Sequence, residues 1–552
     1  MESHEKDWLA GQPILLAIMR IIGLFDRPAS GDCLKALRAK PAIMGLTDAI
    51  VDLDDGVWRR AVARLREVRL LSPPDPQAPE ALDAHPLARE WFGERLRQTN
   101  EAAWKAAHSR LYDHLRRTTS EGKAPTLSDL APLYQAIAHG CRAGRHQEAF
   151  DKIFVERIWR RQRDGNMEYY AIRKLGAFGS DLAAISWFFD KPYETPVATL
   201  NAANRSWALA HASSCLRAQG RFVEALLALR AALRRAEEET DWRNAAIGAS
   251  NLSETELLVG EVAAAVATAE QSVALADRSG NKFQMLSKRT TLADALHVAG
   301  DRDRAERLFA DAERRQQKLQ PEYPLLYSLQ GYRYCDLLLS KGAPASARDR
   351  AARTLAWVSS QKSLPSIALD TLTLGRANLA LTVENFRGRL SVATARDGPR
   401  LVGISFDQAV DGLRVSGENA LLPRGLLTRA AFRRSVGDWG GAARDLDEVE
   451  EIAEPGPMRL FQCDAALERV RLAFARLEAF APLNGLIDDS PSKPALPDAA
   501  EAARLGEEAT ANLAVARELI AKCGYHRRDE ELAELDDVAA GRCRFADLPP
   551  RV

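Results

Sequence analysis

The sequence predicts an all-α protein with one small β wing, in which an N-terminal domain precedes a long helical solenoid. Three observations support this fold class. Alanine, leucine and arginine, all strong helix formers, dominate the composition, while clusters of β-branched residues are scarce. A glycine recurs every 40 residues, at Gly220, Gly260 and Gly300. The first hundred residues lack this repeat and carry a proline-rich turn instead.

The composition is that of a folded protein and excludes some classes of function. The 552 residues are 46% hydrophobic and 28% charged, with 76 basic and 76 acidic side chains. Such a balance argues against disorder and against a generic binder of polyanions, although one local basic surface remains compatible with it. Seven scattered cysteines without a Cys-x-x-Cys pair are typical of reduced thiols. No signal peptide or membrane span is evident, so we expect a soluble, cytoplasmic protein.

Residues 1–100 are predicted to form a winged-helix domain. Three helices are expected first, at residues 14–25, 31–38 and 57–68. Asp54 and Asp55 supply capping chemistry before the third helix. Short strands are expected at 69–72 and 81–84, on either side of a turn that contains four prolines. His85 and Pro86 then open the next helix, where proline is tolerated in the first turn.

A helical linker over residues 101–125 leads into a solenoid over residues 126–540. An alanine lies five residues after each repeat glycine, and another small residue lies seven residues further on. These positions are Ala225, Ala265 and Ala305, followed by Ala232, Ser272 and Ala312. A glycine ends one helix in the left-handed conformation, and small residues let the next helix pack closely. Each helix pair buries only one face, so the pairs must stack.

Weaker copies extend the array to seven or eight helix pairs. The same glycine-to-alanine spacing recurs at Gly144, Gly342 and Gly437. Residues 406–413 fit the second helix of another pair. Two insertions are predicted, a loop or small hairpin near 387–404 and an exposed linker near 482–498, because both are rich in glycine or proline. Residues 541–552 are expected to be a ragged tail.

The helix-turn-helix units resemble tetratricopeptide repeats, although their period of 40 exceeds the usual 34. The segments Leu24–Ala29 and Ala84–Glu90 resemble the winged-helix region of bacterial signal-transduction ATPases with numerous domains (STAND). Those proteins are relatives of the NB-ARC nucleotide switches, and in them the winged helix runs into such repeats. The segments Ala249–Glu254 and Tyr323–Cys335 are also similar to their arrays. The resemblance covers most of the chain and implies its architecture.

The resemblance also implies a role for His85, which matches a histidine that contacts the nucleotide phosphate in that family. Ala84 and Pro86 depart from the family's Met-His-Asp pattern, and His85 alternatively serves only to cap the helix that follows. No Gly-x-x-x-x-Gly-Lys-Ser/Thr loop is present, and the nearest dipeptide is Gly122-Lys123. We therefore expect no cofactor and no ATP hydrolysis by this chain, which resembles the regulatory half of a switch without its nucleotide-binding domain.

Motifs for other chemistry are weak. Nine histidines form no zinc-binding spacing, and no nucleophile elbow occurs, so we expect neither a metal nor a catalytic site. Two basic clusters fit nucleic-acid binding, but solvated helix faces explain them better. These clusters are Arg59, Arg60, Arg64, Arg66 and Arg69 in the third helix, and Arg157, Arg160, Arg161 and Arg163 beside Trp159.

The concave face of the solenoid is the predicted partner-binding site. Aligning the first helices of successive pairs turns one set of polar residues inward, namely Ser250, Glu254, Ser287, Thr290, Asp294, His297, Tyr332 and Asp336. Mixed polar groups with tyrosine suit a protein or peptide ligand, although the same residues would also coat a wet groove without a partner.

The sequence therefore predicts a non-catalytic sensor or scaffold that binds a protein or peptide through the solenoid. Ligand capture would shift an attached nucleotide module between two states. One alternative is a transcription regulator, with the winged helix on DNA and the repeats as sensor. Another is the regulatory part of an effector enzyme whose catalytic domain lies elsewhere.

Overall fold

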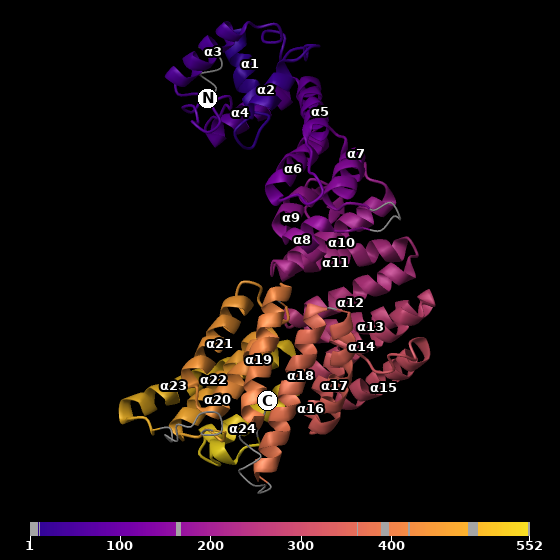
Figure 1. The fold of residues 1–552 in the computed structure, drawn as a ribbon, viewed down its shortest axis with the longest axis vertical. Helices are drawn as coiled ribbons and strands as arrows, with labels where there is room; N and C mark the ends of the chain where they lie inside the picture. The colour runs from indigo at the N-terminus through magenta and orange to yellow at the C-terminus, as the bar shows by residue number, and fades with distance from the viewer. Residues whose placement is uncertain are drawn as a thin grey trace. The chain divides into compact units, whose positions relative to one another are not determined.

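The computed structural model describes residues 9, 11–161, 167–361, 363–387, 397–417, 420–483 and 495–549. The chain forms two compact units, Met1–Ala208 and Leu209–Val552. The boundary falls within helix α10 (Ala202–Ala218), so the positions 100 and 126 predicted as boundaries both lie inside the first unit. Helices make up nearly all of the regular structure in the described residues (Figure 1), which confirms the all-α fold class.

The first unit is built from short helices and one two-stranded antiparallel sheet. Its helices are α1 (Pro13–Ile22), α2 (Gly31–Arg38), α3 (Asp55–Glu67), α4 (Pro86–Thr99), α5 (Glu101–Thr118), α6 (Leu127–Arg142), α7 (His146–Ala149), the π-helix η2 (Phe150–Ile158), α8 (Tyr170–Leu175) and α9 (Phe178–Ser186). The strands β1 (Phe189–Lys191) and β2 (Thr195–Pro196) form the sheet, in which Phe189 pairs with Pro196.

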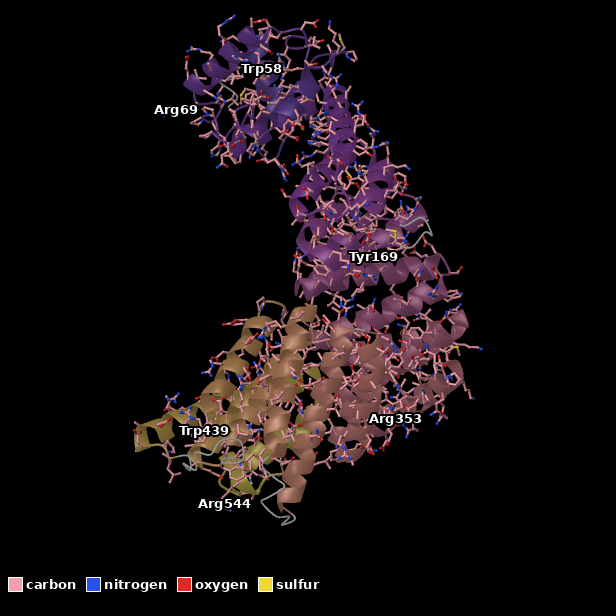
Figure 2. The ribbon with its side chains drawn as sticks, viewed as in Figure 1. Trp58, Arg69, Tyr169, Arg353, Trp439 and Arg544 are labelled. Atoms are coloured by element: carbon pink, nitrogen blue, oxygen red, sulfur yellow. The ribbon has the colours of Figure 1, made fainter. Side chains whose placement is uncertain are left out.

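The predicted N-terminal elements occur in the predicted order. Asp54 caps α3, because its carboxylate accepts hydrogen bonds from the backbone N–H groups of Gly56 at 2.7 Å and Val57 at 3.3 Å. On the same helix, Trp58 packs against the guanidinium of Arg38, which lies 4.2 Å from its ring centre (Figure 2). The expected wing strands do not form a regular ladder: the Ser72 backbone N–H donates one hydrogen bond to the Asp83 carbonyl at 2.8 Å, and Leu82 pairs with Ala29 instead, through two hydrogen bonds of 2.8 and 3.0 Å. The winged-helix assignment itself stays a prediction.

The second unit is an all-α solenoid of paired helices. They are α11 (Phe222–Glu238), α12 (Trp242–Leu258), α13 (Val262–Ser279), α14 (Lys282–Val298), α15 (Arg302–Leu319), α16 (Ser328–Ser340), α17 (Pro344–Ser360), α18 (Leu364–Arg387), α19 (Asp397–Ser416), α20 (Leu422–Val436), α21 (Trp439–Ala453), α22 (Arg459–Leu477), α23 (Ala499–Cys523), η4 (His526–Arg528), α24 (Asp529–Ala539) and η5 (Phe545–Asp547). From α12 to α22, each even-numbered helix packs against the odd-numbered helix that follows it and forms a pair with it (Figure 1).

The repeat signature has the structural meaning that its spacing predicts. The φ angles of Gly220, Gly260 and Gly300 are +73°, +84° and +90°, so each turn uses the left-handed conformation. The alanines five residues later, Ala225, Ala265 and Ala305, are fully buried between helices. Ser272 fills a small-residue position and donates a hydrogen bond to the carbonyl of Ala246 at 2.8 Å. Close helix packing therefore depends on these small side chains.

The solenoid of the second unit closes on its own C-terminal helices. Helix α12, near the start, contacts α22, and α14 contacts η4. Each of the three repeat turns touches a later segment. A Cβ on Gly456 would lie 2.6 Å from the Gly220 carbonyl oxygen, one on Gly260 would lie 2.9 Å from Cβ of Arg459, and one on Gly300 would lie 3.1 Å from Cβ of His526. The first repeats are thus packed against residues 456–526.

The first predicted insertion and the tail differ from expectation in part, whereas most of the second insertion lies outside the described residues. Residues 388–396 and 484–494 lie outside the described residues, whereas 397–404 belong to α19 rather than to a loop. The tail is not ragged over residues 541–549, because Phe545 is buried and its backbone N–H donates to Glu478 at 2.6 Å. Among the described helices, none is both long and apolar enough to cross a membrane.

Candidate functional site

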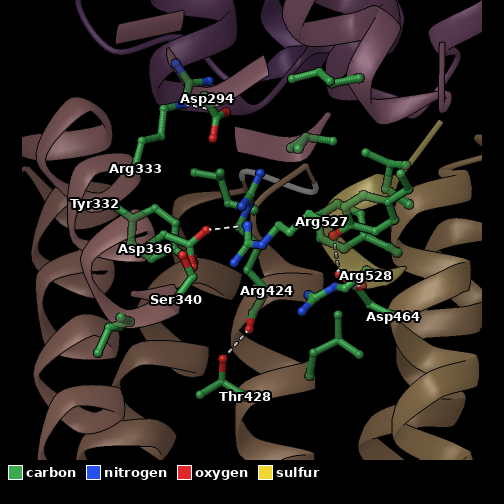
Figure 3. Close-up of a pocket in the computed structure, with 18 of the residues that line it drawn as sticks. Asp294, Tyr332, Arg333, Asp336, Ser340, Arg424, Thr428, Asp464, Arg527 and Arg528 are labelled. Atoms are coloured by element: carbon green, nitrogen blue, oxygen red, sulfur yellow. Dashed lines mark hydrogen bonds and ion pairs between the residues drawn. The ribbon is translucent and has the colours of Figure 1, made fainter. Parts of the chain in front are cut away.

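The inner faces of the even-numbered helices converge on a cavity of about 350 Å³ inside the second unit. Helices α12, α14, α16, α18, α20 and α22 each contribute side chains, and η4 and α24 contribute from the C-terminal end. Figure 3 labels the contributions of α14, α16, α20, α22 and η4. The first helix of each pair lines the interior because the second helix covers its outer side. The volume falls within the range of pockets that hold small molecules.

The cavity walls are unusually rich in charge for a protein interior. Eight arginines and six carboxylates line it among the described residues. Buried charges are tolerated when they are paired and hydrogen-bonded, and each of these carboxylates lies within 4 Å of a guanidinium. The pairs are Glu254–Arg333 at 3.1 Å, Asp294–Arg333 at 3.0 Å, Asp336–Arg527 at 2.6 Å, Asp464–Arg528 at 2.8 Å, Glu468–Arg434 at 2.6 Å and Glu531–Arg471 at 2.6 Å.

Asp336 is the centre of this network. Its carboxylate accepts hydrogen bonds from Arg376 at 2.8 Å and from Arg527 at 2.6 Å, residues on α18 and η4. Burial raises the pKa of Asp336, but the guanidinium groups of Arg527 and Arg376 outweigh burial and hold the pKa well below its usual range. Asp336 is therefore ionised, and it joins the repeats to the C-terminal segment.

His297 lies next to Asp336 without a hydrogen bond between them. Its Nε2 is 3.0 Å from the Ser340 hydroxyl, and its Nδ1 is 3.9 Å from the Asp336 carboxylate. Burial, reinforced by the positive charge of Arg527, lowers the pKa of His297 well below its ordinary value. The imidazole is therefore neutral at pH 7, and it fills space beside the network without adding charge.

Arg424 differs from the other arginines of the cavity. Its guanidinium lies between two aromatic rings, 5.8 Å from the ring centre of Tyr332 and 5.5 Å from that of Phe461. What distinguishes it is that no carboxylate of the described residues forms an ion pair with it, whereas every other arginine of the wall has one; its Nε is also buried without a hydrogen-bond partner. Figure 3 shows Arg424 in the middle of the cluster with Tyr332, Asp336 and Arg527.

The structure brings four of the eight predicted partner-binding residues to the cavity wall, namely Glu254, Asp294, Tyr332 and Asp336. His297 is fully buried behind them. Ser250 and Thr290 are also buried, the former 3.0 Å from the Thr291 hydroxyl and the latter bonded to the carbonyl of half-buried Ser287. The four residues at the cavity wall lie on the first helices of their pairs, but the later helices cover this face, and the predicted partner-binding role stays a prediction.

Sequence reasoning missed all eight arginines of the cavity wall. Arg376 was within reach, because it lies 40 residues after Asp336 and so occupies the next repeat-equivalent position. Arg527 and Arg528 lie in η4, outside any repeat, and no periodicity points to them. Their position in the cavity follows only from the closure of the solenoid.

In the first unit, His85 caps α4: its Nδ1 accepts a hydrogen bond from the Leu87 backbone N–H at 3.3 Å. The alternative role of His85 as a cap is thus present, and its contact with a nucleotide stays a prediction. In the second basic cluster, Arg157 pairs with Glu121 at 2.9 Å and Trp159 is buried. Arg160 donates to the carbonyls of Gly122 and Lys123. These groups hold the fold together and do not form a stacking platform for bases.

One group in the described part of the chain places three potential metal ligands within 4.8 Å of one another: Asp32, Cys33 and His114. His114 Nε2 is already 3.1 Å from the Asp32 carboxylate. Burial raises the pKa of the Cys33 thiol to about 11, which disfavours the thiolate that a metal requires. This arrangement is explained by an ion pair beside a buried cysteine.

Comparison with known proteins gives a similarity in structure. No protein-family model matches the chain, and no curated protein matches it. The solved structure of a signal transduction ATPase with numerous domains from Pyrococcus horikoshii, which has a tetratricopeptide repeat sensor, is similar at 12% identity with a TM-score of 0.36. The similarity covers 95% of this chain and 65% of that one, so the chain spans less than two thirds of that protein's length.

Proposed function

We propose that the chain is a non-catalytic sensor module whose helical-repeat unit binds a ligand in the cavity of the second unit. The observation that supports this most directly is the convergence of six inner helices and the C-terminal segment on one cavity. A ligand there would contact elements that are far apart in sequence, so its binding energy would act on the closure of the whole unit.

The contacts that close the second unit join segments that are far apart in the sequence, and a sensor can use such contacts to respond to a ligand. Arg527 and Asp336 are 191 residues apart, and Arg333 and Glu254 are 79 residues apart. A ligand that alters the first pair changes how tightly the C-terminal segment is held against α16, and one that alters the second changes how α16 is held against α12. We propose that this change is the output of the sensor, and that in a longer protein it acts on a nucleotide-binding module as the regulatory half of a switch.

The helices around the cavity also limit the type of ligand. An extended peptide along the predicted inner residues would collide with α20, α22 and η4, which occupy that space. A small molecule, or a short chain end that enters the cavity, fits the geometry better than a peptide lying along a groove. In place of the protein or peptide partner expected from the sequence, we therefore propose a small molecule or a short chain end that fits into this cavity.

A cavity-filling variant tests the proposed function. Ala380 lines the cavity on α18, and Ala380→Phe would occupy ligand space. Ala274→Phe on the exposed face of α13 is the matched control. Native mass spectrometry after incubation with a host metabolite extract below about 1 kDa should show a bound species on the wild-type and A274F chains and none on A380F. Equal binding by A380F, or no bound species on any chain, would contradict the proposal.

The non-catalytic part of the proposal has its own measurement. Because the sequence contains no phosphate-binding loop, the purified chain should release no more phosphate from ATP than a buffer blank. Turnover that persists through further purification, and that is lost with a point change in the chain, would contradict this part alone.

A further inference from the structure

The charged side chains that line the cavity do not balance one another, although Arg302 also pairs with Glu530 outside the lining at 3.5 Å. Eight arginines face six carboxylates among the described residues. Five of the six carboxylates have a guanidinium partner at 3.0 Å or less, and Glu254 has its partner at 3.1 Å. The cavity wall therefore carries more positive than negative charge, and each of its carboxylates is already neutralised by a guanidinium.

Arg424 carries the part of this positive surplus that has no ion-pair partner among the described residues. Asp294 and Asp336 interact electrostatically with Arg424, but both are paired with other arginines. Asp294 pairs with Arg333, and Asp336 pairs with Arg376 and Arg527. Two aromatic rings flank the Arg424 guanidinium, and its Nε has no acceptor among the described residues. A buried N–H group without an acceptor is unfavourable, and an anion bound in the cavity would neutralise the charge of this guanidinium.

The local backbone adds to the same positive field. Arg424 is the third residue of α20, and the N-cap residue Leu421 offers no side-chain oxygen to the first N–H groups of this 15-residue helix. The amino end of a helix carries partial positive charge, so a basic side chain there is unfavourable without a compensating anion. Ala420 and Leu421 both line the cavity, so this helix end faces it as well.

Apolar side chains also line the cavity, among them Leu329, Leu427, Leu460 and Phe461. A ligand that suits both Arg424 and these side chains has an oxyanion group and a hydrocarbon body. Arginine is the side chain best adapted to carboxylate and phosphate, because its planar fork donates two parallel hydrogen bonds.

We propose that the cavity binds a small organic anion, with its carboxylate or phosphate group against Arg424 and its apolar part against the leucines. This inference rests on the proposed sensor function and specifies the ligand's chemical class. The planar fork of Arg424, flanked by Tyr332 and Phe461, fixes the position of the oxyanion.

The experiment measures binding of defined probes to the full chain by thermal shift and calorimetric titration at constant ionic strength. Hexanoate and hexyl phosphate carry the two candidate oxyanion groups, inorganic phosphate lacks the apolar body, and 1-hexanol lacks the charge. The variants are Arg424→Gln and Arg424→Lys. Arg348→Gln is the matched control, because Arg348 lies on α17 in an exposed pair with Asp349.

At least one of the two hexyl anions should bind wild type and R348Q alike, and the stronger one identifies the oxyanion group. R424Q should lose about 10- to 100-fold in affinity, as expected for a charged hydrogen-bonding pair. R424K should show an intermediate loss, since it keeps the charge without the fork. 1-Hexanol should not compete.

The proposal is overturned if no probe anion binds, if R424Q binds as tightly as wild type, or if 1-hexanol binds as well as the anions. Should R424Q not fold, the comparison of R424K with R348Q decides in the same way. The proposed sensor function survives such a result if A380F still abolishes binding of a metabolite that R424Q retains, so the two failures are distinguishable.

Discussion

Asp336 is the residue on which the charge network of the second unit depends most. Replacing it by asparagine keeps the shape and removes the charge that neutralises Arg376 and Arg527. Removing one partner of a buried ion pair costs about 3–5 kcal/mol. We expect Asp336→Asn to lower the free energy of unfolding by that amount in urea titrations. Asp411→Asn, in an exposed pair with Arg414, should change it by less than about 0.5 kcal/mol; equal effects would contradict this role.

Two buried histidines make the first unit sensitive to acid. His108 and His139 share a hydrogen bond of 2.9 Å between their Nδ1 atoms, and burial lowers the pKa of His139 to about 3 and that of His108 well below 6.5. The unfolded imidazoles bind protons below about pH 6.5 while the folded ones do not, so stability is lost as the pH falls below that value.

The expected slope for His139 alone is about 1.4 kcal/mol per pH unit between about pH 6.5 and 5. His139→Gln should therefore reduce the pH dependence of the first unit's melting temperature, measured by calorimetry. His85→Asn, which keeps an acceptor at the exposed cap of α4, is the control. An unchanged slope in H139Q would show that other groups control the acid response.

At the level of single residues, the sequence predicts which face of a helix a side chain occupies, but not which residues that side chain contacts. The 40-residue spacing of Glu254 and Asp294, on equivalent positions of successive repeats, predicts that both lie on the inner face. Their burial is not predictable, since it depends on helices α20 to α24 returning over that face. Periodicity describes neighbouring repeats and contains no information about contacts across the closure.

At the level of the elements, the turn glycines have two separate reasons to be glycine. Gly260 and Gly280 both have positive φ, +84° and +65°, but only Gly260 is enclosed: Cβ of Arg459 and Sγ of Cys523 would lie within 3 Å of a methyl group at this position. Gly280→Ala should cost about 1–2 kcal/mol for the left-handed conformation alone.

Gly260→Ala should cost at least about twice as much, because the added methyl also pushes α22 and α23 away. Urea unfolding of the two variants measures the difference. Similar losses would mean that the contact between this turn and the later helices adjusts easily.

The last element, η5, is a further test of the closure, because the sequence predicts a ragged tail there. Phe545 packs against Phe474 and Phe480, with ring centres 6.3 and 6.1 Å away. Phe545→Ala should cost about 3–5 kcal/mol, measured by chemical unfolding. Leu496→Ala, at a side chain that is 72% exposed, should be nearly neutral. If F545A left the free energy of unfolding unchanged, the tail would not be part of the folded core.

The start of α19 shows why the predicted insertion near 387–404 is partly wrong. Gly398 and Pro399 favour a loop by composition, yet both lie in the first turn of the helix, where proline costs no hydrogen bond. Composition alone does not separate a helix start from a loop, since both favour the same residues.

At the level of the whole molecule, the two compact units should unfold separately. Units with their own cores depart from a single two-state transition. Calorimetry of the full chain should therefore show two transitions, of which the one assigned to the first unit moves with His139→Gln and the other with Asp336→Asn. A single transition shifted by both variants would contradict independent units.

The closure of the second unit has a consequence for how this protein can change over generations. An open solenoid gains or loses repeats easily, because each repeat contacts only its neighbours. Here an added 40-residue unit between α16 and α22 would carry Arg527 away from Asp336 and move Arg459 away from Gly260. Repeat number is therefore constrained by the ring of contacts, so duplication or deletion of a unit would be selected against even where each new repeat folds well.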